Sequence, residues 1–262
     1  MAKDSQLTDG GGALPPPLRV ITINIHKGYS SFLRRSTLAR VRHKLRLERA
    51  DLVFIQELQD LFPSGVSQTL KPLNPSAIEF LADAYWLDWH YGKNAVYPKG
   101  HHGNAILSRY PLIKGLNYDL SAYRFEHRGA LHSVIEKKRL NGGMQSIHCF
   151  SIHLALFEHG RRRQITQLID EIVCLTRSAA VIIAGDFNDW RNSLGPLMAS
   201  YGFQEVFETL CGKPARTYPS FRPLLRMDRI YVRGLSVRTS RTLNHWASIS
   251  DHIGLLAELD LL

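Results

Sequence analysis

Short apolar runs and longer amphipathic segments alternate along the first third of the chain. Residues 18–25 and 51–57 are runs of β-branched and aliphatic side chains, which predict buried strands. Residues 36–50 place apolar side chains on one helical face and arginines on the other, which predicts an amphipathic helix. Prolines within residues 60–75 predict a loop, and a short helix is expected at residues 76–83.

The middle of the chain has the composition and turn signals of β-structure. Strands are expected at residues 86–91, 104–108, 116–120, 130–136 and 146–153. The tripeptide Asn141-Gly142-Gly143 lies between the last two of these strands. It predicts a hairpin turn, because asparagine and glycine adopt the positive φ angles that tight turns require.

Helical periodicity returns at residues 160–175, and a fully apolar run follows at 180–184. Two more short strands are expected at 227–232 and 255–259. Strands and helices therefore alternate in both halves, while the middle and the end are rich in hairpins. This pattern predicts an α/β fold in which two mixed sheets pack face to face with helices outside.

No repeat or internal linker is visible after the first residues of the chain. Residues 1–17 carry runs of glycine and proline, which predict a flexible N-terminal tail. Residues 18–262 are expected to form one catalytic domain, an ordinary size for a single α/β unit.

Composition narrows the class of protein. Of the 262 residues, 44% are hydrophobic, which is enough for a large core. The three cysteines are too few and too scattered for a disulfide framework or a zinc ribbon, which favours reduced thiols and a cytoplasmic location. No run of 18 apolar residues occurs, so no membrane-spanning helix is expected.

The chain is basic, with a formal net charge of +10. An excess of lysine and arginine favours an anionic partner, such as nucleic acid, anionic lipid headgroups or a phosphorylated metabolite. Net charge alone does not locate a patch, so the alternative of a basic protein with no such partner stays open.

Polar side chains gather at the ends of the predicted strands. They are Asn24, Glu57, His153, Asp186, Asn188, Asp228, Asp251 and His252. Strand ends are where folds of this kind place their chemistry. Taken singly, each residue has an ordinary explanation: a turn asparagine, a solvated strand end, a helix or strand cap, or a core histidine.

Hydrolysis of a phosphodiester requires a water that is oriented or deprotonated, charge neutralisation on the phosphate, and stabilisation of the leaving oxygen. Carboxylate and amide oxygens suit Mg²⁺ or Mn²⁺, and Glu57, Asp251 and Asn24 provide such a set. Zinc is less favoured, because neither a His-x-x-x-His pattern nor paired cysteines occur.

Seven short motifs follow one another in a characteristic order. They are Thr22-Ile-Asn24-Ile, Gln56-Glu57, Gly103-Asn104-Ala-Ile-Leu-Ser108, Ser151-Ile-His153-Leu, Gly185-Asp186-Phe-Asn188, Asp228-Arg-Ile230 and Ser250-Asp251-His252. On these motifs the chain resembles the endonuclease/exonuclease/phosphatase superfamily, which includes deoxyribonuclease I, apurinic endonucleases, neutral sphingomyelinases and inositol-polyphosphate 5-phosphatases. The resemblance implies a four-layered α/β sandwich with mostly antiparallel sheets. It also implies a metal-dependent phosphoesterase.

The resemblance also implies a role for each motif residue. Glu57 would be the main metal ligand, assisted by Asn24 and Asp251. Asp186 would orient and deprotonate the attacking water, and Asn188 would hold water or phosphate.

Further residues are expected on the phosphate side of the site. Asp228 would fix the tautomer of His252, whose other nitrogen would reach the scissile phosphate. His153 would be a second phosphate contact, and Arg128 and Asn104 are expected to bind substrate.

Two differences from apurinic endonucleases indicate which branch of the superfamily the chain resembles. Apurinic endonucleases have an acid where this chain has His26, and they lack a histidine at the position of His153. On both counts the chain resembles the deoxyribonuclease I and sphingomyelinase branch. In deoxyribonuclease I, the histidine that corresponds to His153 has an acidic partner upstream. Asp88 is the nearest candidate here but is out of register.

Three functions compete on this basis. The first expectation is a nuclease that acts on DNA, since the chain is basic and has both histidines. The alternative is a phosphodiesterase or phosphatase that acts on phospholipid headgroups, phosphoinositides or a small phosphorylated metabolite, with peripheral contact to anionic lipid. A catalytically inactive binding module is disfavoured, because the principal motif positions are intact. We expect a monomer.

Overall fold

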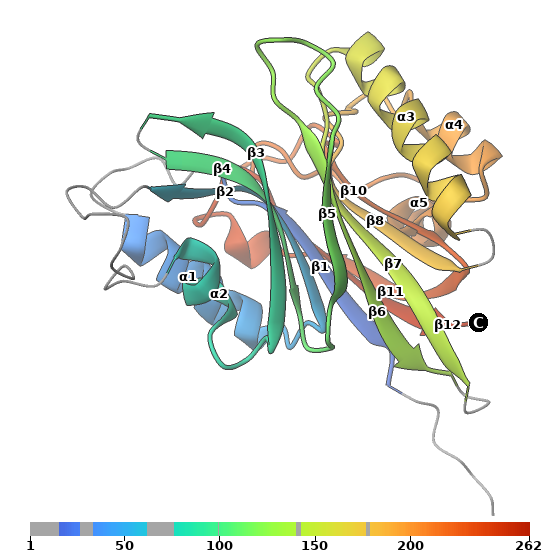
Figure 1. Ribbon diagram of the computed structural model, residues 1–262, viewed down its shortest axis with the longest axis horizontal. Helices are drawn as coiled ribbons and strands as arrows, with labels where there is room; N and C mark the ends of the chain where they lie inside the picture. Colours follow the sequence, from blue (N-terminus) through green and yellow to red (C-terminus); the bar gives the residue numbers. More distant parts are fainter. Residues whose placement is uncertain (1–15, 27–33, 62–75, 99, 140–142, 177–178) are drawn as a thin grey trace, which may run out of the picture.

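A computed structural model of the chain describes residues 16–26, 34–61, 76–98, 100–139, 143–176 and 179–262. Most of the predicted tail, the segment 62–75 of the predicted loop, and the turn residues Asn141 and Gly142 lie outside these ranges. The described part is built on two six-stranded sheets that face one another, with helices on both outer sides (Figure 1). This arrangement confirms the predicted α/β fold class.

The first sheet contains β1 (Leu18–Asn24), β2 (Leu52–Leu61), β3 (Asp88–Tyr97), β4 (Gly100–Ser108), β11 (Leu235–Thr242) and β12 (Leu255–Leu261). Their order across the sheet is β11-β12-β1-β2-β4-β3. Only β1 and β2 run parallel to each other, and the other neighbours are antiparallel. Helices α1 (Arg34–Leu47) and α2 (Ala77–Ala82) lie on the outer side of this sheet (Figure 1).

The second sheet contains β5 (Ile113–Asp119), β6 (Gly129–Lys138), β7 (Met144–His153), β8 (Ala180–Asp186), β9 (Gln204–Glu205) and β10 (Asp228–Arg233). Their order is β5-β6-β7-β8-β10-β9, and here β7 and β8 form the parallel pair. Helices α3 (Glu158–Thr176) and α4 (Gly195–Ser200) lie on its outer side (Figure 1). Helix α5 (Val206–Cys211) packs against β10 and against β11 of the first sheet, and its Val206 and Phe207 join the core between the sheets. A short 3₁₀ turn, η2 (Asn244–Trp246), precedes β12.

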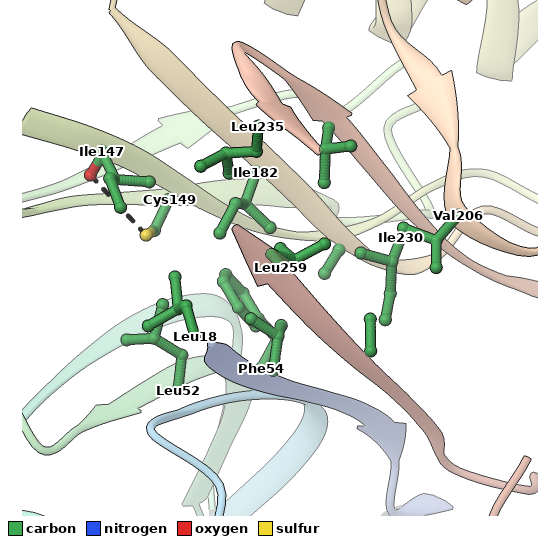
Figure 2. Close-up of a cluster of buried hydrophobic side chains, with 14 of the residues drawn as sticks. Leu18, Leu52, Phe54, Ile147, Cys149, Ile182, Val206, Ile230, Leu235 and Leu259 are labelled. Atoms are coloured by element: carbon green, nitrogen blue, oxygen red, sulfur yellow. Dashed lines mark hydrogen bonds between the residues drawn. The ribbon is translucent and has the colours of Figure 1, made fainter. Parts of the chain in front are cut away.

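The core between the sheets is made by alternate side chains of strands from both. Leu18, Leu52 and Phe54 of the first sheet meet Ile182 and Ile230 of the second (Figure 2). All five side chains are fully buried. Because the opposite faces of these strands pack under helices, the strands are apolar on both faces, which explains their continuous apolar runs.

Local signals placed several boundaries correctly. Ser76 caps α2 in a capping box with Glu79, as expected for a helix that begins near Ser76. Trp86, predicted as the first residue of a strand, lies before β3 instead. It is buried, and its indole N–H donates to the carbonyl of Ala50 at 3.1 Å, so tertiary packing fixes this residue outside the ladder.

Other elements carry too weak a sequence pattern to be predicted. The β3–β4 hairpin extends to Tyr97 and Gly100, well beyond the strands expected there, because the polar segment in between carries no apolar alternation. The edge strand β11 and the short helices α4 and α5 were not predicted. An edge strand with one exposed face has the weakest hydrophobic pattern. Among the described residues, no helix is long and apolar enough to cross a membrane.

Candidate active site

The site lies where the ends of strands from both sheets meet. Each parallel strand pair is joined by a helix on the outside, β1-α1-β2 in one sheet and β7-α3-β8 in the other. Parallel strands have their carboxyl ends at the same edge, so Asn24 and Glu57 meet in the first sheet, and His153 lies opposite Asp186 in the second. Asp228 begins β10 directly opposite Asp186.

Asn24 joins the two halves of the site. Its Nδ2 donates to Asp186 Oδ2 at 3.0 Å, across the sheets, and lies 3.4 Å from Glu57 Oε1. Its Oδ1 accepts the backbone N–H of His26 at 2.9 Å, so the amide orientation is fixed by its partners. The structure therefore brings together two carboxylates from different sheets through one buried amide.

Three residues of this region have left-handed backbone conformations. Their φ angles are 41° for His26, 56° for Glu57 and 51° for Asn188. Glu57 lies at a register shift in β2, between Ile55 and Leu58, which turns its side chain away from the regular alternation. Such conformations cost about 1 kcal/mol or more each in a residue other than glycine, and they are concentrated at functional sites.

His252 and Asp228 form a hydrogen-bonded pair. His252 Nδ1 lies 2.9 Å from Asp228 Oδ2, and its Nε2 is 3.9 Å from Asp186 Oδ2. Burial lowers the pKa of His252, but the charge and hydrogen bond of Asp228, followed by the charge of Asp186, outweigh it and raise the pKa to about 10. The imidazole is thus held as a cation at neutral pH, with Nε2 directed to the centre of the site.

Asp186 is almost fully buried at this centre. Burial raises its pKa to about 6, although the neighbouring His252 cation opposes the shift. Its Oδ1 accepts the backbone N–H of Asn188 at 2.9 Å, which orients the carboxylate. Asn188 is buried as well, and its Nδ2 donates to the carbonyl of Leu154 at 2.9 Å, which ties the loop after β8 to the end of β7.

His153 lies between carboxylates and a guanidinium. Its Nε2 is 3.6 Å from Asp186 Oδ2 and its Nδ1 is 3.9 Å from Glu57 Oε1. Arg128 Nη1 lies 3.4 Å from the same Nδ1, and Arg128 Nη2 donates to Glu126 at 3.0 Å. An arginine can only donate, so this contact favours the neutral histidine with its proton on Nε2.

The acid that supports His153 is not the one nearest in the sequence pattern. Asp88 accepts the backbone N–H groups of Trp89 and Leu112 at the far end of β3, so it is not the partner of His153. The carboxylates nearest to His153 are those of Asp186 at 3.6 Å and Glu57 at 3.9 Å, and Glu126 acts on it only through Arg128. Glu126 lies in an irregular loop, where no periodic pattern could identify it.

Asn104 is buried between the sheets. Its Nδ2 donates to the carbonyls of Gly129 at 2.8 Å and Ser151 at 3.1 Å. These carbonyls lie next to Arg128 and two residues before His153. The structure therefore gives the Asn104 amide two backbone partners rather than an open position facing substrate.

Asp251 completes the predicted metal set from the loop before β12. Ser250 Oγ donates to the Asn24 carbonyl at 2.7 Å, which brings Asp251 to the first sheet's side of the site. Asp251 Oδ2 lies 3.2 Å from His26 Nδ1. The side chains of Glu57 and Asp251 are 15% and 33% exposed, so they are the accessible carboxylates of the site.

The donor atoms fit a hard divalent cation. Glu57, Asp251 and Asn24 offer carboxylate and amide oxygens, the ligands that Mg²⁺ and Mn²⁺ prefer. A second group, Asp186, Asp228 and His252, has ligand atoms within 4.8 Å of one another. In that group the Asp228–His252 hydrogen bond already uses one potential ligand atom of each residue. This geometry is suited to general acid–base catalysis rather than to metal binding.

Two buried arginines stabilise the loops that carry the site. Arg161 lies near the start of α3, where a cation is unfavourable for the helix dipole. It is buried, donates to the carbonyl of Leu156, and packs over the ring of Trp190. Arg229, also fully buried, donates to the carbonyls of Asp228 and Asp189, and so ties β10 to the loop after β8.

Known proteins resemble this chain in sequence and in fold. A sequence model of the Endonuclease/Exonuclease/phosphatase family matches residues 21–252. The protein YbhP of Escherichia coli K12 is 42% identical over 246 residues, 93% of this chain and 96% of YbhP.

Solved structures resemble the fold at lower identity. An endonuclease/exonuclease/phosphatase from Beutenbergia cavernae superposes with a TM-score of 0.73 at 20% identity, covering 94% of this chain and 72% of that one. D. rerio TDP2, complexed with single strand DNA product, gives a TM-score of 0.66 at 17% identity, with 93% and 98% coverage.

Proposed function

This chain belongs to the endonuclease/exonuclease/phosphatase family, and we propose that it hydrolyses phosphodiester bonds with the help of a divalent cation, Mg²⁺ or Mn²⁺. Family membership supports a phosphoesterase- or nuclease-type hydrolase. The convergence of Asn24, His153 and His252 on the buried carboxylate of Asp186 supports this function most directly. We assign the activity to one domain, residues 18–262.

We assign the cation to the accessible oxygen ligands. Glu57 would be the main ligand, with Asn24 and Asp251 beside it, directly or through water. When bound there, the cation would neutralise phosphate charge and stabilise the leaving oxygen. The left-handed backbone at Glu57 supports this assignment, since the bulge costs energy and its effect is to direct this carboxylate into the site.

The buried polar residues would move protons. Asp186 would orient the attacking water and accept its proton, and its orientation is set by the Asn24 amide and the Asn188 N–H. Asp228 would hold the His252 imidazolium by its Nδ1–H, so that the Nε2–H faces the scissile phosphate. Asn188 would act by fixing the loop after β8, because its own amide is bonded to Leu154.

His153 and Arg128 would contact the non-bridging oxygens of the phosphate. The guanidinium of Arg128 is oriented by Glu126 on one side and faces His153 on the other. Asn104 would support both by holding the carbonyls of Gly129 and Ser151 in place. We therefore assign Asn104 a positioning role in substrate binding.

DNA is the first substrate that we propose. The net charge of +10 favours a polyanion, and Arg128 beside His153 is suited to a phosphate backbone. The second candidate is a phosphodiester or phosphomonoester in a lipid headgroup or small metabolite. It is favoured by exposed apolar side chains close to the site, such as Phe125 and Phe221. We propose a cytoplasmic monomer in either case.

An activity panel tests the function. The purified chain would be assayed with Mg²⁺, with Mn²⁺ and with EDTA on supercoiled plasmid, bis-p-nitrophenyl phosphate and phospholipid vesicles. We expect hydrolysis of at least one diester that EDTA abolishes. Glu57→Gln, purified in parallel, controls for contaminating enzymes. Equal turnover with and without metal, or no turnover of any diester by a folded chain, contradicts the proposed function.

A further inference from the structure

Large apolar side chains are exposed on the segments that surround the candidate active site. They are Phe125 (78% exposed), Leu156 (52%), Phe157 (60%), Trp190 (36%), Phe221 (84%) and Leu224 (53%). Scattered exposed apolar residues are normal, but several on neighbouring loops at one site indicate an interaction surface. We call these six residues the apolar rim.

Each segment of the rim is attached to the site. Phe125 lies three residues before Arg128, Leu156 three residues after His153, and Trp190 two residues after Asn188. The fourth segment is held by Ser220, whose N–H donates to the Asp251 carbonyl at 2.7 Å. The rim residues thus lie on segments that also carry, or are hydrogen-bonded to, the residues to which we assign chemistry.

The rim is supported from beneath by specific contacts. The ring of Tyr123 stacks on Phe125 at 5.4 Å and meets Phe157 edge-on at 6.1 Å. The N–H of Leu156 donates to Glu126, which joins the β5–β6 loop to the start of α3, two segments at the same end of the molecule in Figure 1. Phe125, Leu156 and Phe157 are therefore held in place by packing and hydrogen bonds while their side chains stay exposed.

Exposed arginines accompany the aromatic residues. The pairs are Arg124-Phe125, Trp190-Arg191 and Phe221-Arg222, and each arginine is exposed. An aromatic ring beside a cation fits the boundary between headgroups and acyl chains of an anionic bilayer, where the ring is buried and the guanidinium meets phosphate.

Single-stranded nucleic acid is the other anionic partner that exposed aromatic and cationic residues can bind, because the rings stack on bases. Stacking uses flat rings in a groove, whereas Leu156 and Leu224 are aliphatic, and Phe125 and Phe221 are the more exposed of the rim residues. Aliphatic side chains that project from the surface gain more by entering an apolar layer than by contact with bases. Four of the six rim residues are aromatic and could also stack on bases, so the two exposed leucines are the members that favour lipid.

We propose that the apolar rim and its three arginines form a docking surface for a bilayer that contains anionic phospholipids. Docking would bring lipid headgroups, with their phosphodiester bonds, to the mouth of the active site. Only this consequence rests on the proposed function, through its second candidate substrate; the binding itself does not require catalysis.

Co-sedimentation with vesicles tests the docking surface. The full chain would be mixed with phosphatidylcholine vesicles, with and without about 30% phosphatidylglycerol, at low ionic strength. We expect binding to the anionic vesicles and at least tenfold weaker binding by the double variant Phe125→Ser/Phe221→Ser. Arg124→Glu/Arg222→Glu should lose the preference for phosphatidylglycerol. The control Leu87→Ser, a 79% exposed leucine at the other end of β3 from the β3–β4 hairpin, should bind as the parent does.

Two further measurements separate docking from catalysis. Glu57→Gln should bind vesicles as tightly as the parent even where it hydrolyses nothing. Vesicle binding can therefore be interpreted even if the proposed function is wrong. Circular dichroism melting would show that each variant is folded. The docking surface is overturned if the parent does not bind anionic vesicles, or if Leu87→Ser weakens binding as much as the rim variants. Binding of a single-stranded oligonucleotide instead, lost in the same rim variants, would also overturn it.

Discussion

At the scale of single residues, Glu57 and Asp186 should differ in what their amide variants lose. Glu57→Gln removes one charged ligand and should weaken Mg²⁺ binding, with activity at limiting Mg²⁺ falling at least a hundredfold. Asp186→Asn should lower kcat by about 10²–10⁴ with metal affinity nearly unchanged, because its proposed partner is the water. Calorimetric titration with Mg²⁺ beside steady-state kinetics gives both readouts.

The reverse pattern would exchange the two roles. If Asp186→Asn lost the metal and Glu57→Gln kept it, the cation would belong to the group of Asp186, Asp228 and His252, whose ligand atoms lie within 4.8 Å of one another.

The Asp228–His252 pair should behave as one unit. Asp228→Asn and His252→Ala should each lower kcat by about 10²–10⁴, and the double variant should be little worse than either, because the carboxylate acts only through the imidazole at 2.9 Å. The measurement is a double-mutant cycle on kcat. Losses that add fully would mean that the two residues act separately.

At the scale of elements, the buried amide of Asn104 links the two sheets. Asn104→Ala leaves the buried carbonyls of Gly129 and Ser151 without this donor, so the free energy of unfolding should fall by about 2–3 kcal/mol. Asn117→Ala is the matched control, since its Nδ2 also donates to a backbone carbonyl, that of Lys93, but on the surface. Urea denaturation should give less than about 1 kcal/mol there. Equal, small losses would remove the structural role of Asn104.

The β6–β7 pair contains a histidine whose charge is suppressed by folding. Burial, together with His148 at 3.0 Å, lowers the pKa of His132 to about 4. As the pH falls through about 6.5, the imidazole of His132 is protonated in the unfolded chain but stays neutral in the folded chain. The stabilisation from this group is therefore present at pH 7 and is lost as the pH falls from about 6.5 toward 4. The loss at pH 5 should be about 1–2 kcal/mol.

The variant His132→Phe keeps the ring that stacks on Phe150 and removes the titration. Its free energy of unfolding, measured in urea, should fall less between pH 7 and pH 5 than that of the parent. His43→Phe, at an exposed position on α1, should keep the pH dependence of the parent. The assignment to His132 is wrong if both variants lose stability in parallel with the parent.

At the scale of the whole molecule, the net charge of +10 predicts how substrate affinity depends on salt for each substrate class. If DNA binds, lysines and arginines displace condensed counterions, and affinity should fall by about a hundredfold or more between about 50 and 200 mM salt. A small diester makes few such contacts and should show a shallow dependence. The measurement is plasmid nicking across a salt series at saturating metal, beside hydrolysis of bis-p-nitrophenyl phosphate. Parallel shallow curves would count against DNA.

Local sequence was sufficient to predict the positions of the inner strands and to identify candidate residues for the site. The apolar runs at 18–25, 51–57 and 180–184 are buried on both faces, so their pattern depends little on which element covers them. Polar residues stand at or just after the end of each run. Their position at a strand end locates Asn24, Glu57 and Asp186 as candidates. Their family resemblance then implies roles that variants must still test.

Sequence order could not show which of these residues touch. The hydrogen bond from Asn24 to Asp186 spans 162 residues, and it exists because the two sheets pack face to face with their strand ends at one edge. The contact of Glu126 with Arg128 and the burial of Arg161 depend on loop paths that carry no periodic signal. The two backbone partners of Asn104 come from strands of the other sheet. Strand identity is thus determined by local apolar patterning, whereas the pairing of polar groups, and with it the environment of Asp186 and His252, is decided only when the sheets close over a common core.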